Sequence, residues 1–311
     1  MSYSVGRDGS FLAGSIDRAR SFLAGHGRLL ERRRFELLAG RCGPEPVLAA
    51  LDGYRNPDGG YGWGIEPDLR DASSQPAGAL HALEVLAELS AAGAEQAVAL
   101  LDWLAGNSLP DGGLPFALPV LDPAGVAPFW AAADPGSSSL QITAAVAGQA
   151  YRLTAVLPEL AGHAWLTTAT GYCLAAIEGL PDRPGAYELS FALQLLDAVS
   201  DRQPAAAELL DRLGRRLLPA DGVLPVAGGA AGEVLRALDI APWPDRPIRK
   251  LFAPALIEAE FARLVGEQRP DGGWQPDFDS YSPAGRLDWR GYATVRAVSI
   301  LLRNGVAADT P

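Results

Sequence analysis

The stretch NPDGGYGWGIEPDLRDASSQ, residues 56–75, opens with a turn and continues with two aromatic and, counting the turn aspartate, four acidic residues. Related stretches recur as LPDGGLPF (109–116), PADGVLPV (219–226) and RPDGGWQPDFD (269–279). Proline presets φ, aspartate hydrogen-bonds to its own backbone, and glycine accepts a positive φ. Each stretch therefore predicts a tight turn at the same point of a repeated unit.

The spacing of these turns gives the size of the unit. Asp58, Asp111, Asp221 and Asp271 are separated by 53, 110 and 50 residues. The middle interval spans two units, with a degenerate turn near GLPDRPGAY (179–187). A period of about 50 residues indicates a stacked supersecondary unit.

Helices fill each unit. GALHALEVLAEL (78–89) has leucines on one face and His81, Glu84 and Glu88 on another, which is the helical period. Similar patterns occur at 95–106, 189–199, 206–218, 253–265 and 292–302. Because period-two runs are absent, we expect an all-α fold of eleven or twelve helices. Ser73, Ser74 and residues 137–139 are candidate N-caps. About six helical pairs would close into a ring with both termini on one rim.

Composition limits the function classes. The 311 residues are 48% hydrophobic, and 26 basic against 37 acidic residues give a net charge of −11, which argues against nucleic-acid binding. RLLERRRF (28–35) is a basic exception, either a solvated helix face or a site for phosphate or anionic lipid. No signal core or membrane-length apolar run is present, so we expect a cytoplasmic protein. Cys42 and Cys173 have no metal-type spacing with any histidine, so we expect no zinc.

QRPDGGWQPDF, with Gln268, Asp271 and Trp274, resembles the Gln-Trp repeat of the prenyltransferase and squalene-hopene cyclase superfamily. NPDGGYGW matches the same motif, with Asn56 in place of glutamine and Tyr61 in place of tryptophan. The resemblance covers residues 10–305 and is greatest to the bacterial branch with one barrel. It implies a single (α/α)6 barrel, residues 1–311 as one domain, that holds an isoprenoid chain.

Two departures from the superfamily concern the site. In class II cyclases the turn is followed by Asp-x-Asp-Asp-Thr, whose central aspartate is the proton donor. Here RDASSQ keeps the first aspartate of that motif as Asp71 but has Ser73 and Ser74 in place of the other two. LDWRGYAT keeps only the first aspartate, as Asp288. The Asp-Cys-His zinc site of protein prenyltransferases is not visible, which argues against protein prenylation.

The residues themselves favour carbocation chemistry. Protonating an alkene needs a strong acid in a dry site, and aromatic faces stabilise the cation without acting as nucleophiles. Three clusters offer both kinds of side chain. They contain Tyr61, Trp63, Glu66, Asp68 and Asp71; Phe129, Trp130 and Asp134; and Asp277, Asp279, Tyr281, Asp288, Trp289 and Tyr292. Tyr187 is a further candidate at the start of an inner helix.

We expect Glu66 or Asp68 to be the acid. Both lie between the turn and the next helix, and neither is needed to form the turn or to cap the helix. Asp71 would orient the acid, Trp63 and Trp130 would flank the cation, and Asp279 or Asp288 would replace the acid if neither serves. Most other aspartates are expected to form turns or caps. Trp274 is expected to pack helix ends together, and His81 to lie on the surface or behind the site.

Three functions remain open. The first is an atypical class II-type terpene cyclase acting on a linear isoprenoid or a prenylated small molecule. The second is a carbohydrate-active enzyme with paired carboxylates, because (α/α)6 barrels also host such enzymes. The third is a non-catalytic isoprenoid- or lipid-binding protein. No cofactor is expected, except Mg²⁺ if the substrate carries a diphosphate, which Arg70, Arg286 or Arg290 would receive.

Overall fold

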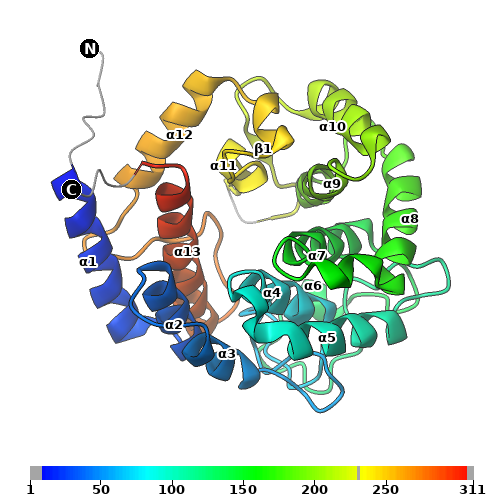
Figure 1. The fold of residues 1–311 in the computed structure, drawn as a ribbon, viewed down its shortest axis with the longest axis horizontal. Coiled ribbons are helices and arrows are strands. Elements are labelled where there is room, and N and C mark those ends of the chain that lie inside the picture. Colours follow the sequence, from blue (N-terminus) through cyan, green and yellow to red (C-terminus); the bar gives the residue numbers. More distant parts are fainter. Residues whose placement is uncertain (1–8, 230–231, 307–311) are drawn as a thin grey trace.

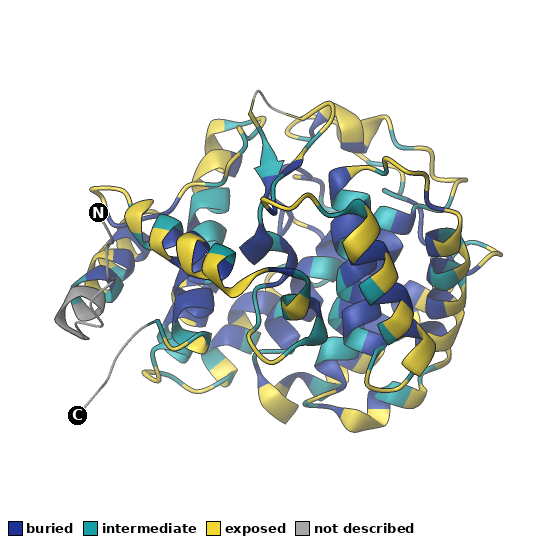
Figure 2. Ribbon diagram, turned by 90° about the horizontal axis from the view of Figure 1, so that it is seen from above, coloured by how far each residue is buried: buried dark blue, intermediate teal, exposed yellow. Residues whose placement is uncertain are grey.

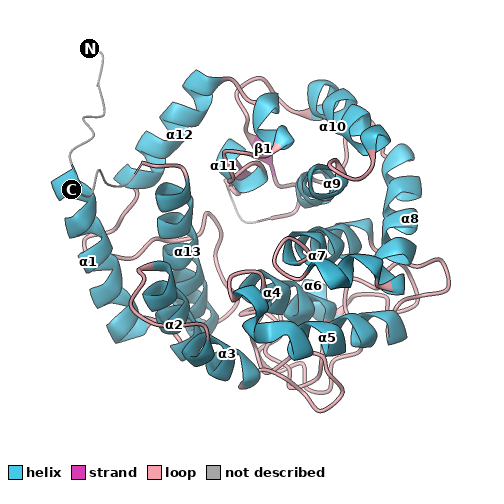
Figure 3. Cartoon of the chain, viewed as in Figure 1, coloured by secondary structure: helices cyan, strands magenta, loops and turns pink. Residues whose placement is uncertain are grey.

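The computed structural model describes residues 9–229 and 232–306, and helices dominate it (Figure 3). The α-helices are α1 (Gly9–His26), α2 (Leu29–Leu38), α3 (Glu45–Asp52), α4 (Pro76–Leu86), α5 (Ala94–Gly106), α6 (Pro128–Ala131), α7 (Leu140–Leu153), α8 (Ala164–Glu178), α9 (Ala186–Val199), α10 (Pro204–Leu217), α11 (Ala237–Ile240), α12 (Pro254–Gly266) and α13 (Pro283–Arg303). Three 3₁₀ helices are η1 (Ser90–Gly93), η2 (Pro158–Gly162) and η3 (Pro247–Leu251), and one antiparallel pair is β1 (Leu224–Pro225) and β2 (Val234–Leu235). The all-α prediction is confirmed.

The helices follow one another around a centre. In Figure 1, α2, α4, α7, α9, α11 and α13 lie towards the centre, and α1, α3, α5, α8, α10 and α12 lie towards the rim. Neighbouring central helices pack together in the series α4, α7, α9 and α11, and α13 packs on both α1 and α2. Buried residues gather where helices face one another (Figure 2). The termini themselves lie outside the described residues, but the helices nearest to them are in contact.

The repeated turns have the predicted chemistry. Asp58, Asp111, Asp221 and Asp271 each accept a hydrogen bond from the backbone N–H two residues later. The glycines that follow them have φ values of 91°, 90°, 67° and 94°, a region that favours glycine. A serine supports two of these turns: Ser74 donates to Asp58 and Ser138 donates to Asp111. The turn motif thus fixes the loop before an inner helix.

Two capping predictions have different outcomes. Ser139 caps α7, because its side chain accepts from the N–H of Ile142. The prediction that Ser73 or Ser74 caps the next helix is wrong. α4 begins after Gln75 without a side-chain cap, since Ser74 is turned towards Asp58 and Ser73 towards Asp71.

The basic run at 28–35 is only in part a solvated face. Most of it forms α2, where Arg34 is 8% exposed and pairs with Glu88 of the segment that follows α4. Arg28, just before α2, pairs with Glu31, whose side chain is 1% exposed. The solvated-face prediction is therefore wrong for Arg28 and Arg34 but holds for Arg32 and Arg33, which are exposed. Trp274, by contrast, packs as predicted: it is 2% exposed and its indole donates to the carbonyl of Leu264.

Candidate functional site

Two buried carboxylates lie in the loop before α4. Glu66 and Asp68 are 7% and 5% exposed. Asp68 accepts hydrogen bonds from the Ser280 hydroxyl (2.7 Å), the Tyr281 backbone N–H (3.2 Å) and the Trp289 indole (2.8 Å). This carboxylate therefore joins the first repeat to α13 and the loop before it.

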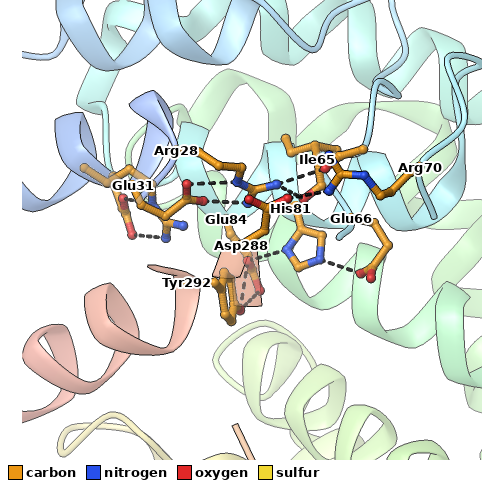
Figure 4. Close-up of polar contacts among 12 residues, drawn as sticks. Arg28, Glu31, Ile65, Glu66, Arg70, His81, Glu84, Asp288 and Tyr292 are labelled. Carbon is orange, nitrogen blue, oxygen red and sulfur yellow. Dashed lines mark hydrogen bonds and ion pairs between the residues drawn. The ribbon is translucent and has the colours of Figure 1, made fainter. Parts of the chain in front are cut away.

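Glu66 begins a chain of polar side chains that crosses the inner helices (Figure 4). His81 of α4 places Nε2 2.8 Å from Glu66 and Nδ1 3.1 Å from Glu84. Tyr292 of α13 donates its hydroxyl to both oxygens of Glu84, at 3.0 and 3.1 Å. Glu66 also accepts from the backbone N–H of Asp68, so the two acids belong to one network.

The network holds a proton on His81. Burial lowers the pKa of His81, but its hydrogen bonds to Glu66 and Glu84 outweigh that effect and raise the pKa to about 9. Burial likewise acts to raise the pKa of Glu84, and His81 together with Arg34 brings it below its usual value. At neutral pH a cation is therefore bound between two carboxylates.

Two arginines fix the loop that carries Glu66. Arg28 donates to the carbonyls of Gly64 and Ile65 while it is paired with Glu31. Arg70, just beyond the acids, is paired with Asp288 of α13 (Figure 4). The acids thus lie on a stretch of backbone held from both sides.

Aromatic rings surround these acids. His81 meets Trp289 and Tyr292 edge to face, with ring centroids 5.9 and 5.3 Å apart. Phe278 also contacts Trp289, with their ring centroids 5.1 Å apart. A second group joins Phe116, Trp130, Phe129 and Tyr281 through successive ring contacts. Tyr281 connects that group to the acid, because its backbone N–H donates to Asp68.

Several side chains of α13 reach across to other elements. On α13, Trp289, Tyr292 and Arg296 reach side chains of the first repeat, α4 and α11, so this face of the helix points across the ring. These three residues are only half-buried. Tyr187 and Phe191 of α9, stacked on one another, are half-buried as well. The aromatic side chains of α13 and α9 are therefore not fully packed into the core.

Several predicted site residues lie together and others do not. The structure brings Glu66, Asp68, Trp289 and Tyr292 into one network, with Phe129 and Trp130 in the neighbouring aromatic group. Tyr187 donates to Glu233 at 2.8 Å, and Glu66 is among the charges that act on its raised pKa.

Asp71 is turned away from the acids that it was expected to orient. Its oxygens accept from Ser73 and from the backbone N–H groups of Leu121 and Asp122. Burial opposes the effect of these bonds, yet the pKa of Asp71 is lowered. Because the carboxylate joins two loops, it is not in contact with Glu66 or Asp68.

Trp63 and Tyr61 also lie outside the network. Trp63 is 58% exposed with φ of 56°, and its indole donates to Asn56. Two hollows of about 300 and 440 Å³ lie beside it on the outer face, both also lined by Leu121. Tyr61 is fully buried in the core, and its pKa is raised by burial. The expectation that Trp63 stands beside the acids is wrong, because the backbone turns its ring outwards.

The remaining candidates have other partners. Asp134 is an exposed turn residue that accepts from Gly136 and Ser137. Asp279 is exposed. Asp288 is paired with Arg70, and Arg290 binds both oxygens of Asp271 and lies over the ring of Phe22 at 4.4 Å. Arg290 thus supports the last turn.

Sequence reasoning missed the centre of the network. His81 was placed on the surface or behind the site, and it is 7% exposed between Glu66 and Glu84. The signal was present: His81, Glu84 and Glu88 share one face of a helix expected in the inner row. Ser280 and Arg28 carried no comparable signal, because each acts through a contact distant in sequence.

Neither a candidate metal-binding group nor a candidate membrane-spanning helix is found in the described part of the chain. Across 9–229 and 232–306, no group of three or more His, Cys, Asp or Glu side chains is arranged so that it could hold a metal ion. Within the same residues, no helix combines the length and hydropathy needed to cross a bilayer. The expectations of no zinc and of optional Mg²⁺ stay predictions.

The comparisons with known proteins concern the fold. No protein-family profile and no curated sequence matches the chain. A protein from Actinoplanes superposes with a TM-score of 0.56 at 16% identity over 94% of this chain and 99% of that one. The type II terpene cyclase MstE from Scytonema superposes with a TM-score of 0.55 at 15% identity over 94% and 98%. A variant of MstE in complex with its substrate, geranylgeranyl dihydroxybenzoate, gives 0.52 at 16% identity over 95% and 98%. The chain therefore has a terpene cyclase-like fold.

Proposed function

We propose that the protein is an acid-initiated, class II-type terpene cyclase built as a single (α/α)6 toroid. Its substrate would be a linear isoprenoid or a prenylated small molecule. The observation that carries the proposal is the position of Asp68, a buried carboxyl group bonded to the indole of Trp289 and bordered by aromatic rings. The likeness to MstE supports it at the level of the fold.

Asp68 suits the role of acid better than Glu66. A carboxylate has about four lone-pair sites, and three donors occupy two sites on Oδ1 and one on Oδ2 of Asp68. One site on Oδ2 remains for a proton. The same donors would hydrogen-bond the carboxylate that is left when the proton departs. Glu66 instead pairs with the cationic His81 and holds the backbone N–H of Asp68.

The reaction that follows is an isomerisation. Asp68 transfers its proton to a terminal alkene carbon, and a C–H bond forms. An internal alkene attacks the resulting cation, a C–C bond forms, and the positive charge moves along the chain. Loss of a proton to a carboxylate or water then gives a cyclic isomer. Trp289, Tyr292 and Phe129 supply π faces that stabilise the cation.

Replacement of the acids tests the proposal. We expect Asp68→Asn to lower turnover of geranylgeraniol, geranylgeranyl diphosphate or a geranylgeranylated hydroxybenzoate by at least about 100-fold, the usual scale of a lost general acid. Ser280→Ala removes one donor and should cost about tenfold. Mass spectrometry should find a wild-type product of unchanged mass. The exposed Asp134→Asn is the matched control and should retain wild-type turnover.

The outcomes distinguish which carboxyl group is the acid and whether the protein is a cyclase or only binds isoprenoids. Wild-type turnover that survives in both Asp68→Asn and Glu66→Gln would reject both acids and leave Asp279 or Asp288. Failure of the wild type on all three substrates would reject catalysis in favour of an isoprenoid-binding protein. That second candidate has one observation in its favour: every oxygen of Glu66 and Asp68 already has a hydrogen-bond donor. Circular dichroism of each variant checks the fold.

A further inference from the structure

Two arginines without carboxylate partners share one tryptophan at the far end of the inner helices. The guanidinium carbons of Arg152 and Arg303 each lie 4.7 Å from the ring centroid of Trp243. Among the described residues, no carboxylate lies within ion-pair distance of either arginine. Arg152 has only Gln149 as a side-chain hydrogen-bond partner. Two like charges are thus held close together.

Two carboxylates act on Arg152 from a distance without forming an ion pair with it. Glu84 and Glu88 act on Arg152 from α4, but Glu84 is bound to His81 and Tyr292, and Glu88 to Arg34. The arginines end α7 and α13, where helix dipoles contribute only about half a negative charge each. Burial, with a smaller contribution from Arg303, lowers the pKa of Arg152 to about 10 against the raising effect of Glu84 and Glu88. The indole N–H of Trp243 is also buried without a partner.

One face of α13 leads from the acid to this cluster. Trp289, Tyr292, Arg296 and Arg303 are spaced by 3, 4 and 7 residues, which places them along one stripe of the helix. Trp289 binds Asp68 at the beginning of the stripe, and Arg303 lies at its end. Arg303 follows Trp289 by 14 positions, which corresponds to a rise of about 21 Å at 1.5 Å per residue. A chain of several isoprene units has a comparable extended length.

We infer that Arg152 and Arg303, stacked on Trp243, bind the anionic head group of an isoprenoid whose terminal alkene lies at Asp68. The inference rests on the proposed function and deepens it, because it names an anionic polyprenyl compound as the substrate class. Two guanidinium groups suit the oxygens of a diphosphate or a carboxylate. An anion in contact with both arginines would be attracted by two positive charges.

Direct binding tests the inference separately from catalysis. Calorimetric titration in Mg²⁺-free buffer compares geranylgeranyl diphosphate, a geranylgeranylated hydroxybenzoic acid and neutral geranylgeraniol. We expect at least one anionic ligand to bind the wild type at least tenfold more tightly than the alcohol. Arg303→Gln and Arg152→Gln should each remove that preference and leave affinity for the alcohol unchanged. The exposed Arg212→Gln should behave as wild type, and added salt should weaken only the anionic ligands.

The outcomes distinguish this site from the proposed reaction. A preference for the diphosphate or for the carboxylate identifies the head group. Equal binding of all three ligands, or a preference that survives in Arg152→Gln/Arg303→Gln, overturns the head-group site, whether or not the wild type cyclises a substrate. Anion binding lost in these variants without turnover in the wild type supports the site and rejects the cyclase. Arg303 is exposed, so Arg303→Gln tests the site even if Arg152→Gln fails to fold.

Discussion

His81 is cationic at neutral pH because two carboxylates accept hydrogen bonds from its ring. Its folded pKa is about 9, above the ordinary value of 6.5. A raised pKa in the folded state contributes stability that is complete below pH 6.5 and is lost as the pH rises through 9. The pair of carboxylates therefore makes the fold, and not only the site, sensitive to alkaline pH.

This pH dependence is testable by urea unfolding at pH 6 and pH 9.5. The wild type should lose on the order of 2 kcal/mol more than His81→Gln over that range, because one pKa unit corresponds to about 1.4 kcal/mol and part of the shift is offset by relaxation. Glutamine keeps hydrogen-bonding capacity but cannot titrate. An equal loss of stability in both proteins would show that His81 is not the titrating group.

The repeated turns act at the scale of the element. Gly272 has φ of 94°, and a Cβ there would lie 2.2 Å from the backbone oxygen of Arg18 in α1. Gly40 also has a positive φ, 67°, but has open space around it. Alanine substitutions at these two glycines therefore separate the cost of backbone strain from the cost of a steric clash.

Gly272→Ala should destabilise the protein by more than 2 kcal/mol, because the clash adds to the left-handed strain of roughly 1 kcal/mol. Gly40→Ala should show the strain alone. Thermal and urea unfolding of both variants give the comparison. Equal losses would mean that α1 moves away from the turn at little cost.

The sequence predicts elements better than it predicts which way their polar faces point. The turns and the helical period were visible because both follow from local chemistry, and the Ser139 cap follows in the same way. An inner helix of a ring, however, has a polar side that faces the interior. Its pattern matches that of a surface helix, so a solvated face was one prediction for 28–35, and His81 was predicted to lie on the surface or behind the site. Contacts such as Ser280 with Asp68 join residues more than 200 positions apart and leave no local trace.

At the scale of the whole molecule, the ends of the chain close the ring. Gln268, in the loop after α12, accepts from Ser15 and Arg18 of α1 and donates to the backbone carbonyl of Ser15. α1 in turn packs on α13. A break at this junction would expose Phe22 and Trp274, which are 1% and 2% exposed.

We therefore expect residues 1–311 to unfold as one domain. Calorimetric and van't Hoff enthalpies should agree, and far-ultraviolet circular dichroism and tryptophan fluorescence should report one midpoint. Gln268→Ala removes the polar contacts across the junction and should lower that midpoint by a few degrees while keeping a single transition. Gln96→Ala, at an exposed contact with Asp52 in the first repeats, is the control and should leave the midpoint unchanged. Two separated transitions in the wild type would reject the single domain, because an open arrangement of repeats can lose its ends before its middle.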